Sequence, residues 1–206
     1  MLSRKVHGIE MIRLLFAVVF IFGSLIAPAY AVTFDIWHTG MTRQQILQAA
    51  QERNLPLAKG GGLNLNKRYD PKLLVGDATS YNYQTTLFNH SAKVQLRLSP
   101  AKGGYGQFLY GIDVIFTDSS KNKDLRPYVT RMLREKYGPP QVVPDLVRQV
   151  LLWKPEPNNE VRLTSFMVTM QVNYVDLKIK KFADELSKST FELPGNPVNH
   201  RDSGKF

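Results

Sequence analysis

The fold is decided by FLYGIDVIF, residues 108–116, a run that is apolar on both faces of a strand except at Asp113. Strands that are apolar on both faces are buried, so we expect this run to lie at the centre of a sheet. Asp113 then needs a partner, since a buried acid is either paired or neutral. An ion pair with arginine or lysine is one interpretation of this residue, and a catalytic carboxylate is the other.

Two segments before this run alternate between apolar and polar side chains. The apolar positions are Tyr81, Tyr83, Thr85 and Leu87, followed by Ala92, Val94, Leu96 and Leu98. This alternation predicts two strands with one buried face each, joined by a turn at Asn89-His90-Ser91. A helix comes before them: Thr42 and Gln45 have the spacing of a capping box, and Asn54-Leu55-Pro56 should end it.

The run is followed by a helix and three more predicted strands. Leu125, Tyr128, Val129, Met132, Leu133 and Tyr137 recur every three or four residues, and Gly138 with two prolines marks the helix end. We expect strands over 147–154, 160–165 and 166–174, with Val168, Met170, Val172 and Tyr174 on one face. A last helix is predicted over 176–186.

These elements predict an α+β fold with antiparallel sheets and helices packed on one face. Their order is α-βββ in residues 32–118 and again in 119–188, where the closing helix follows. A tandem duplication is one interpretation of this order, and chance recurrence of a common pattern is the other. Residues 189–206 contain few large apolar side chains, and we expect them to form a flexible tail.

Residues 1–31 have the features of a signal peptide. Arg4, Lys5 and Arg13 precede an uncharged run from Leu14, and the segment ends in Ala29-Tyr30-Ala31, which suits signal peptidase. A retained membrane anchor is the alternative, since residues 14–31 approach the length that crosses a bilayer. Gly23 and Pro28 favour cleavage after Ala31. The true start is open between Met1 and Met11, because the segment from Met11 also reads as a complete leader.

Cleavage after Ala31 would leave 175 of the 206 residues, enough for a sizeable core. The sequence has no cysteine, so disulfides and lipid attachment through an N-terminal cysteine are excluded. The leader holds three basic residues and one acidic residue, which leaves 24 basic and 16 acidic residues and a net charge of +8. We expect a periplasmic or secreted protein with no membrane span after processing. Its charge favours anionic partners, whereas the export signal argues against nucleic acid.

The segment Gly40-Met41-Thr42-Arg43-Gln44-Gln45-Ile46 opens a helix in an exported chain and is followed by antiparallel strands. In this it resembles the small lipoproteins of the outer-membrane β-barrel assembly machinery, the SmpA/OmlA type. The doubled α-β order is also similar to that of the β-lactamase inhibitor proteins, which carry this fold in tandem. The resemblance implies a non-catalytic envelope protein that acts by contact. The chain departs from the first family in lacking the lipid-bearing cysteine.

A search for catalytic groups yields little. The histidines after the leader are His38, His90 and His200, and none has the spacing of metal ligands. Gly60-Gly61-Gly62 is not followed by the Lys-Ser/Thr of a phosphate-binding loop. We therefore predict no catalytic residue, no metal site and no cofactor.

Two surfaces are candidates for binding. The first is a basic patch, which requires that two predicted helices be neighbours: Arg126, Arg131 and Arg134 on one, and Lys178, Lys180 and Lys181 on the other. The second is an exposed sheet face bearing Tyr81, Tyr83, Trp153 and Tyr174, although aromatic residues at strand spacing are more often core.

The leading functional hypothesis is an exported, non-enzymatic protein that binds an envelope or other target protein, or an anionic surface. Two alternatives stay open. One is a secreted effector or inhibitor. The other is a periplasmic hydrolase that pairs Asp113 with an acid from residues 59–76, which predicts a deep pocket at Asp113.

Overall fold

The run at residues 108–116 forms the central strand in the computed structural model, which describes residues 31–60, 68–74, 77–102, 104, 106–117, 124–145, 147–166 and 168–188. Strand β6 (Leu109–Phe116) is hydrogen-bonded to a neighbouring strand on each side. The expected leader, apart from Ala31, and the expected tail at 189–206 lie outside the described residues.

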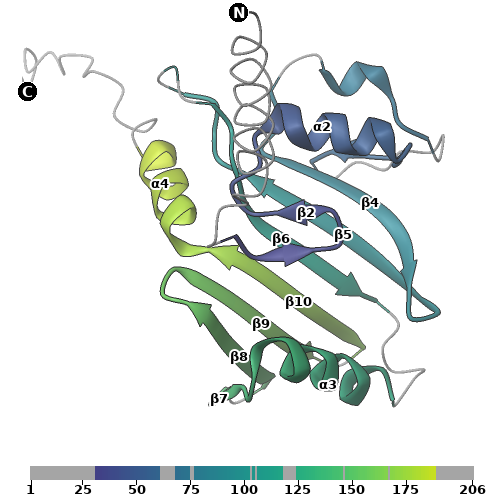
Figure 1. Ribbon diagram of the computed structural model, residues 1–206, viewed down its shortest axis with the longest axis vertical. Coiled ribbons are helices and arrows are strands. Elements are labelled where there is room, and N and C mark those ends of the chain that lie inside the picture. The colour runs from purple at the N-terminus through teal and green to yellow at the C-terminus, as the bar shows by residue number, and fades with distance from the viewer. Residues whose placement is uncertain are drawn as a thin grey trace, which may run out of the picture. The chain divides into compact units, whose positions relative to one another are not determined.

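Strand β6 belongs to an antiparallel sheet of eight strands in the order β3-β4-β5-β6-β10-β9-β8-β7 (Figure 1). The other strands are β3 (Ala58–Lys59), β4 (Ser80–Leu87), β5 (His90–Leu98), β7 (Gln141–Val143), β8 (Gln149–Glu156), β9 (Asn159–Phe166) and β10 (Thr169–Asp176). The described residues also form three α-helices and a 3-10 helix, η1 (Pro71–Leu74). The chain therefore has the expected α+β fold.

In each half a helix precedes four strands, one more than the α-βββ order predicts, because the short edge strands β3 and β7 were not expected. Helix α2 (Arg43–Glu52) precedes β3 to β6, and helix α3 (Leu125–Tyr137) precedes β7 to β10. Each half places its last strand at the centre of the sheet, where Val114 of β6 lies opposite Val172 of β10. Both halves contribute to one hydrophobic core. Whether a duplication produced this order stays a prediction.

Helix α2 begins and helix α3 ends at the residues that the sequence predicts. The backbone N–H of Thr42 donates to Oε1 of Gln45 at 2.8 Å, and the N–H of Gln45 donates to Oγ1 of Thr42 at 3.3 Å, which completes the capping box. Helix α3 ends at Gly138, whose φ of +83° lies in the left-handed region that glycine tolerates best.

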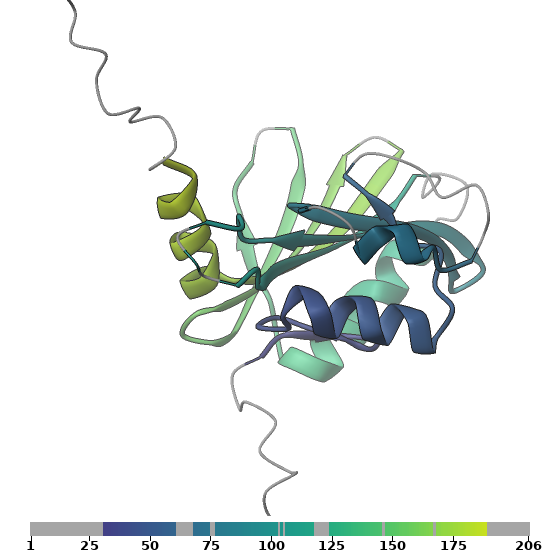
Figure 2. The ribbon, with the colours of Figure 1, turned by 90° about the horizontal axis from the view of Figure 1, so that it is seen from above.

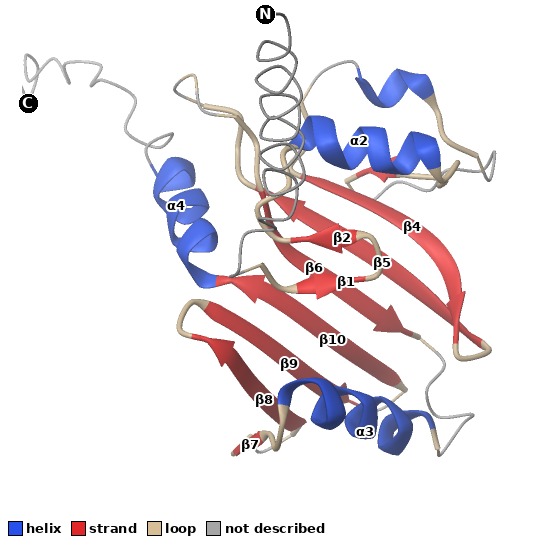
Figure 3. Cartoon of the chain, viewed as in Figure 1, coloured by secondary structure: helices blue, strands red, loops and turns tan. Residues whose placement is uncertain are grey.

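Helices α2 and α3 lie on the same face of the sheet (Figure 2). Between them, in front of the central strands, lies a hairpin of β1 (Thr33–Phe34) and β2 (Trp37–His38), as Figure 3 shows. Trp37 is fully buried, and its Nε1 donates to the hydroxyl of Tyr83 at 2.9 Å, which ties the hairpin to β4. This hairpin has no counterpart among the predicted elements.

The predicted closing helix is present as α4 (Leu177–Lys188), which follows β10 and contacts β6. It lies at the end of the central strands rather than across the face that α2 and α3 cover (Figure 1). Within the described part of the chain, no helix is both long and apolar enough to cross a membrane.

Two turns differ from those expected. The β4–β5 turn has Phe88 and Asn89 at its tip, with Leu87 opposite His90, so the predicted turn at residues 89–91 is placed one residue late. The predicted strand over 166–174 begins only at Thr169, because β9 extends to Phe166 and Val168 lies in the turn before β10. Val168 is therefore 52 % exposed and does not share the buried face of Met170 and Val172.

Candidate functional site

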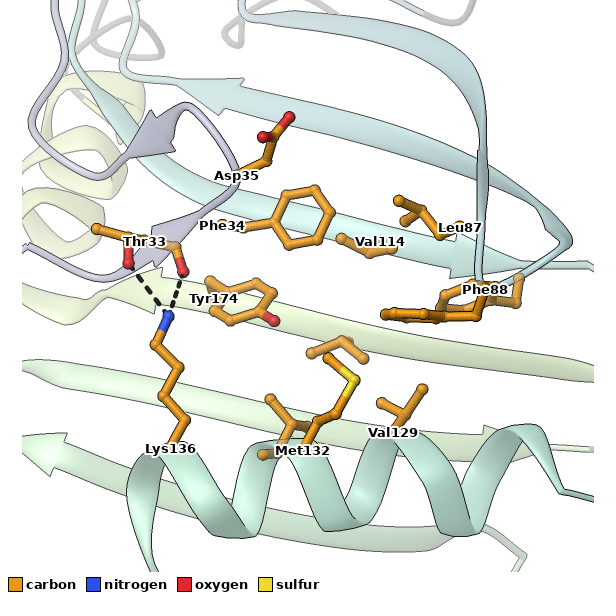
Figure 4. Close-up of a pocket in the computed structure, with 13 residues that line it drawn as sticks. Thr33, Phe34, Asp35, Leu87, Phe88, Val114, Val129, Met132, Lys136 and Tyr174 are labelled. Carbon is orange, nitrogen blue, oxygen red and sulfur yellow. Dashed lines mark hydrogen bonds between the residues drawn. The ribbon is translucent and has the colours of Figure 1, made fainter.

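An apolar cleft of about 250 Å³ opens on the helix-covered face of the sheet (Figure 4). Its floor is formed by Val114 and Phe116 of β6 and Val172 of β10. Its walls come from three other segments: Phe34 of the β1–β2 hairpin, Leu87 and Phe88 of the β4–β5 turn, and Val129, Met132 and Leu133 of α3. The cleft thus lies over the junction of the two halves.

The cleft exists because the covering elements leave the centre of the sheet partly open. Helix α2 belongs to the half that contains β6, and α3 to the half that contains β10. The hairpin between them has only two residues in each strand. Phe34 packs over Tyr174 with ring centroids 5.7 Å apart, but the hairpin is too short to reach the β4–β5 turn.

The β4–β5 turn holds Phe88 in an uncommon backbone conformation. Phe88 and Asn89 have φ values of +53° and +63°, the left-handed pattern of a two-residue turn that ordinarily selects Asn-Gly. Phe88 is 40 % exposed, and its ring meets that of Tyr128 edge-on with centroids 5.0 Å apart. Tyr128 is also 40 % exposed, so the two rings form an accessible aromatic pair beside the cleft.

Polar groups line the rim on the hairpin side. Nζ of Lys136 donates to the carbonyl oxygen and to Oγ1 of Thr33, both at 3.2 Å, and the side chain of Asp35 lies farther along the hairpin (Figure 4). Tyr174 also lines the cleft, and burial raises the pKa of its phenol well above the ordinary value. The Tyr174 hydroxyl is therefore neutral under physiological conditions.

The predicted arginines and lysines form two separate groups. Arg126, Arg131 and Arg134 line a shallow depression of about 340 Å³ on α3, next to Leu151 of β8. The other three, Lys178, Lys180 and Lys181, lie on α4, where Lys180 pairs with Asp184 at 2.7 Å. Figures 1 and 2 place α3 and α4 apart, so the neighbouring helices that a joint basic patch requires are not found. A partner-binding role for these residues stays a prediction.

Asp113 forms the ion pair that the sequence suggested. Its Oδ1 accepts from Nη2 of Arg97 at 2.9 Å and from Nδ2 of Asn173 at 2.7 Å. Burial raises the pKa of this carboxyl, and the Arg97 charge and the two hydrogen bonds offset only part of that effect. Asp113 is 6 % exposed and lines neither the cleft nor the α3 depression. Of the 59–76 segment that the hydrolase alternative pairs with Asp113, residues 61–67, 75 and 76 lie outside the described residues, so that alternative stays a prediction.

The predicted aromatic anchors are core residues instead. Tyr81, Tyr83, Trp153 and Tyr174 are between 0 % and 7 % exposed, so they do not form the exposed sheet face that was suggested, although Tyr174 borders the apolar cleft. Of the histidines, His38 donates through Nδ1 to the carbonyl oxygen of Thr39, 3.2 Å away, and His200 lies outside the described residues. In the described ranges, no three His, Asp or Glu side chains gather in a way that could hold a metal ion.

Sequence reasoning missed the cleft and its lining residues Phe34, Phe88, Met132 and Lys136. The sequence contains one signal for this site. Phe88 directly precedes the predicted turn at Asn89, and a large aromatic residue is unusual beside a turn. The SmpA/OmlA and inhibitor resemblances stay expectations. Comparison with protein-family models, with curated proteins and with solved structures finds no match to this chain.

Proposed function

We propose that this chain is an exported, non-enzymatic protein of the cell envelope, periplasmic or secreted, that acts by binding a partner protein. The observation that carries the proposal is the solvent-open apolar cleft at the centre of the helix-covered face. The signal-peptide features of residues 1–31 support export.

The size of the cleft favours protein side chains as its occupant. Its volume of about 250 Å³ is below the roughly 300 Å³ at which small-molecule sites ordinarily begin. It exceeds the roughly 150 Å³ of an engineered cavity that binds benzene. The space therefore suits one or two apolar side chains, which are the groups that anchor protein interfaces.

The chemistry of the lining also favours binding over catalysis. The ionisable side chains that line the cleft are Asp35, Lys136 and Tyr174. Tyr174 is held neutral by burial, and Lys136 is hydrogen-bonded to Thr33. These groups can orient a bound segment at the rim, whereas the apolar floor contributes the burial of surface that drives association.

The proposal is tested by photo-crosslinking in the native organism. A photoreactive phenylalanine analogue replaces Phe88 in one variant and Val142, a 77 % exposed residue of β7, in a control variant. We expect position 88 to crosslink to a defined envelope protein and position 142 not to. Cell fractionation with N-terminal sequencing should find a chain cleaved after Ala31 in the periplasm or the medium.

Two results would contradict the proposal. One is a chain that keeps its leader and stays in the cytosol. The other is identical crosslinking from positions 88 and 142, or no adduct from either, because an exposed position far from the cleft should not report a partner that the cleft anchors.

A further inference from the structure

We infer that the cleft recognises an aromatic side chain, phenylalanine in particular, carried by an acidic segment of the partner protein. This inference rests on the proposed function and specifies the chemistry of the partner. Three observations on described residues support it: the conformation of Phe88, the aromatic and sulfur-containing lining, and the distribution of charge along α3.

The left-handed backbone conformation of Phe88 indicates that its side chain has a role other than forming the turn. A left-handed conformation is unfavourable for a residue with a bulky side chain, and the turn alone would be better served by Asn or Gly. Strained residues persist where the surrounding structure holds them, and they concentrate at binding sites. Here the strain positions an aromatic ring at the mouth of the cleft, where Tyr128 supports it edge-on.

The lining favours an aromatic occupant over an aliphatic one. Phe34 and Tyr174 on one side and Phe88 on the other provide ring faces and edges, and Met132 provides a polarisable sulfur between them (Figure 4). Aromatic rings pair with such neighbours in edge-to-face and sulfur–ring contacts, which add to the energy of apolar burial.

Charge complementarity determines the flanks of the bound segment. Helix α3 carries four basic residues and one acidic residue, Glu135. At the rim, Nζ of Lys136 is bonded to two neutral oxygens of Thr33 and lies 5.0 Å from the centre of the Tyr137 ring, and Arg131 lies over the Tyr128 ring at 5.5 Å. Among the described residues, the acids on these elements are Asp35 on the hairpin, Asp124 directly before α3, and Glu135, 4.0 Å from Arg131. The surplus on α3 therefore favours aspartate and glutamate beside the anchor.

The test uses a short synthetic peptide with one phenylalanine between aspartate and glutamate residues. Binding is followed by NMR on purified protein labelled at the methionine methyl groups, because Met132 lines the cleft whereas the buried Met41 does not and serves as an internal control. We expect the Met132 signal to shift and the Met41 signal to stay. Replacing the peptide's phenylalanine by alanine should weaken binding by about tenfold or more.

Matched variants separate the roles of charge and of the cleft. Lys136→Gln should weaken binding of the acidic peptide several-fold, and the effect should fade in high salt. Lys93→Gln makes the same charge change on β5, where the alternation with Val94 places Lys93 on the sheet face opposite the cleft, and it should leave binding unchanged. Phe88→Asn, which suits the turn, should keep the fold and reduce the affinity for the phenylalanine peptide.

The inference is overturned if the alanine peptide binds as well as the phenylalanine peptide, or if Lys136→Gln and Lys93→Gln have equal effects. It is also overturned if decanoate shifts the Met132 signal and the peptide does not, which would assign the cleft to an acyl chain. Concentration-dependent self-association that occupies the cleft would assign it to a second copy. Crosslinking from position 88 tests the proposed function separately, since it requires a partner protein but no particular anchor.

Discussion

At the scale of single residues, the most constrained group is Asp113 on the face of the sheet opposite the helices. Arg97 reaches it across Gly111, and the Arg97 guanidinium also lies over the Tyr110 ring at 5.2 Å. A buried ion pair is weakly stabilising at best, but removing one partner leaves the other charge buried and unpaired. The Arg97–Asp113 pair therefore adds little net stability, but it restricts which side chains can replace either partner or Gly111.

Arg97→Gln should lower the free energy of unfolding by about 2–3 kcal/mol near pH 7, since it leaves a buried carboxylate without its cation. The loss should shrink toward pH 4. Burial raises the pKa of Asp113 in the folded protein, so protonation of this carboxyl favours folding as the pH falls, and losing Arg97 raises that pKa further. Urea unfolding at both pH values measures this. Asp113→Asn should cost less than Arg97→Gln, because the Arg97 side chain that it leaves without its anion is 26 % exposed. Equal losses at both pH values would argue against an uncompensated carboxylate.

Gly111→Ala should act through the same pair. A Cβ at position 111 would lie 2.7 Å from Nη2 of Arg97, so the guanidinium must move away from Asp113. We expect a loss of about 2 kcal/mol in wild type and a much smaller one in the Arg97→Gln background, because both changes disrupt one interaction. Gly106→Ala is the control, since its added carbon meets Phe108 at an ordinary 3.8 Å. Additive losses in the double variant would contradict this account.

At the scale of elements, the β4–β5 turn combines strain with an aromatic contact. Phe88→Gly should relieve about 1 kcal/mol of left-handed strain and lose a contact worth about 0.5–1.5 kcal/mol. The thermal midpoint should therefore change little. Tyr128→Ala loses the same contact without relieving strain and should lower the midpoint more. A Phe88→Gly variant that is the less stable of the two would show that the turn is not strained by Phe88.

The helices and strands that could be predicted are those whose capping residues or apolar periodicity lie within one short stretch of sequence. The capping box of Thr42 and Gln45, the apolar stripe of α3 and the alternation in β4 and in β5 are each complete within 13 residues or fewer. The β1–β2 hairpin has strands of two residues, too short for any periodicity to appear.

The candidate site could not be predicted in the same way. Phe34, Phe88 and Met132 come from three segments far apart in the chain, and only the order of strands in the sheet brings them to one cleft. No spacing along the sequence reports such a contact. The ion pair of Asp113 was foreseeable because a lone acid in an apolar strand requires a partner, but the choice of Arg97 depends on the β5–β6 register.

At the scale of the whole molecule, the two halves share both a sheet and a core. Strands β6 and β10 pair from Gly111–Val175 to Phe116–Met170 across the centre. The core contains fully buried residues from both sides, such as Trp37 and Val161. Separating the halves would expose this core and break the central strand pairing. We therefore expect global unfolding to reflect buried groups in either half.

The burial of Tyr83 in this core makes the global stability dependent on pH. Burial raises the pKa of Tyr83 to about 12, although the hydrogen bond from Trp37 acts in the opposite direction. The unfolded phenol ionises near pH 10, so stability is fully present below that value. It should fall by about 2–3 kcal/mol as the pH rises from 10 to 12.

Tyr83→Phe separates this effect from other groups that titrate at high pH. The variant should lose about 1 kcal/mol near pH 7, because Nε1 of Trp37 is left without its partner. Its stability should then decline less steeply than that of wild type between pH 10 and 12, since one buried phenol fewer must ionise. Urea unfolding across this range, with tyrosinate absorbance to follow ionisation, measures both slopes. If the free energy of unfolding fell with pH equally steeply in wild type and in the variant, Tyr83 would ionise as an exposed phenol does. That result would contradict the pH dependence argued here.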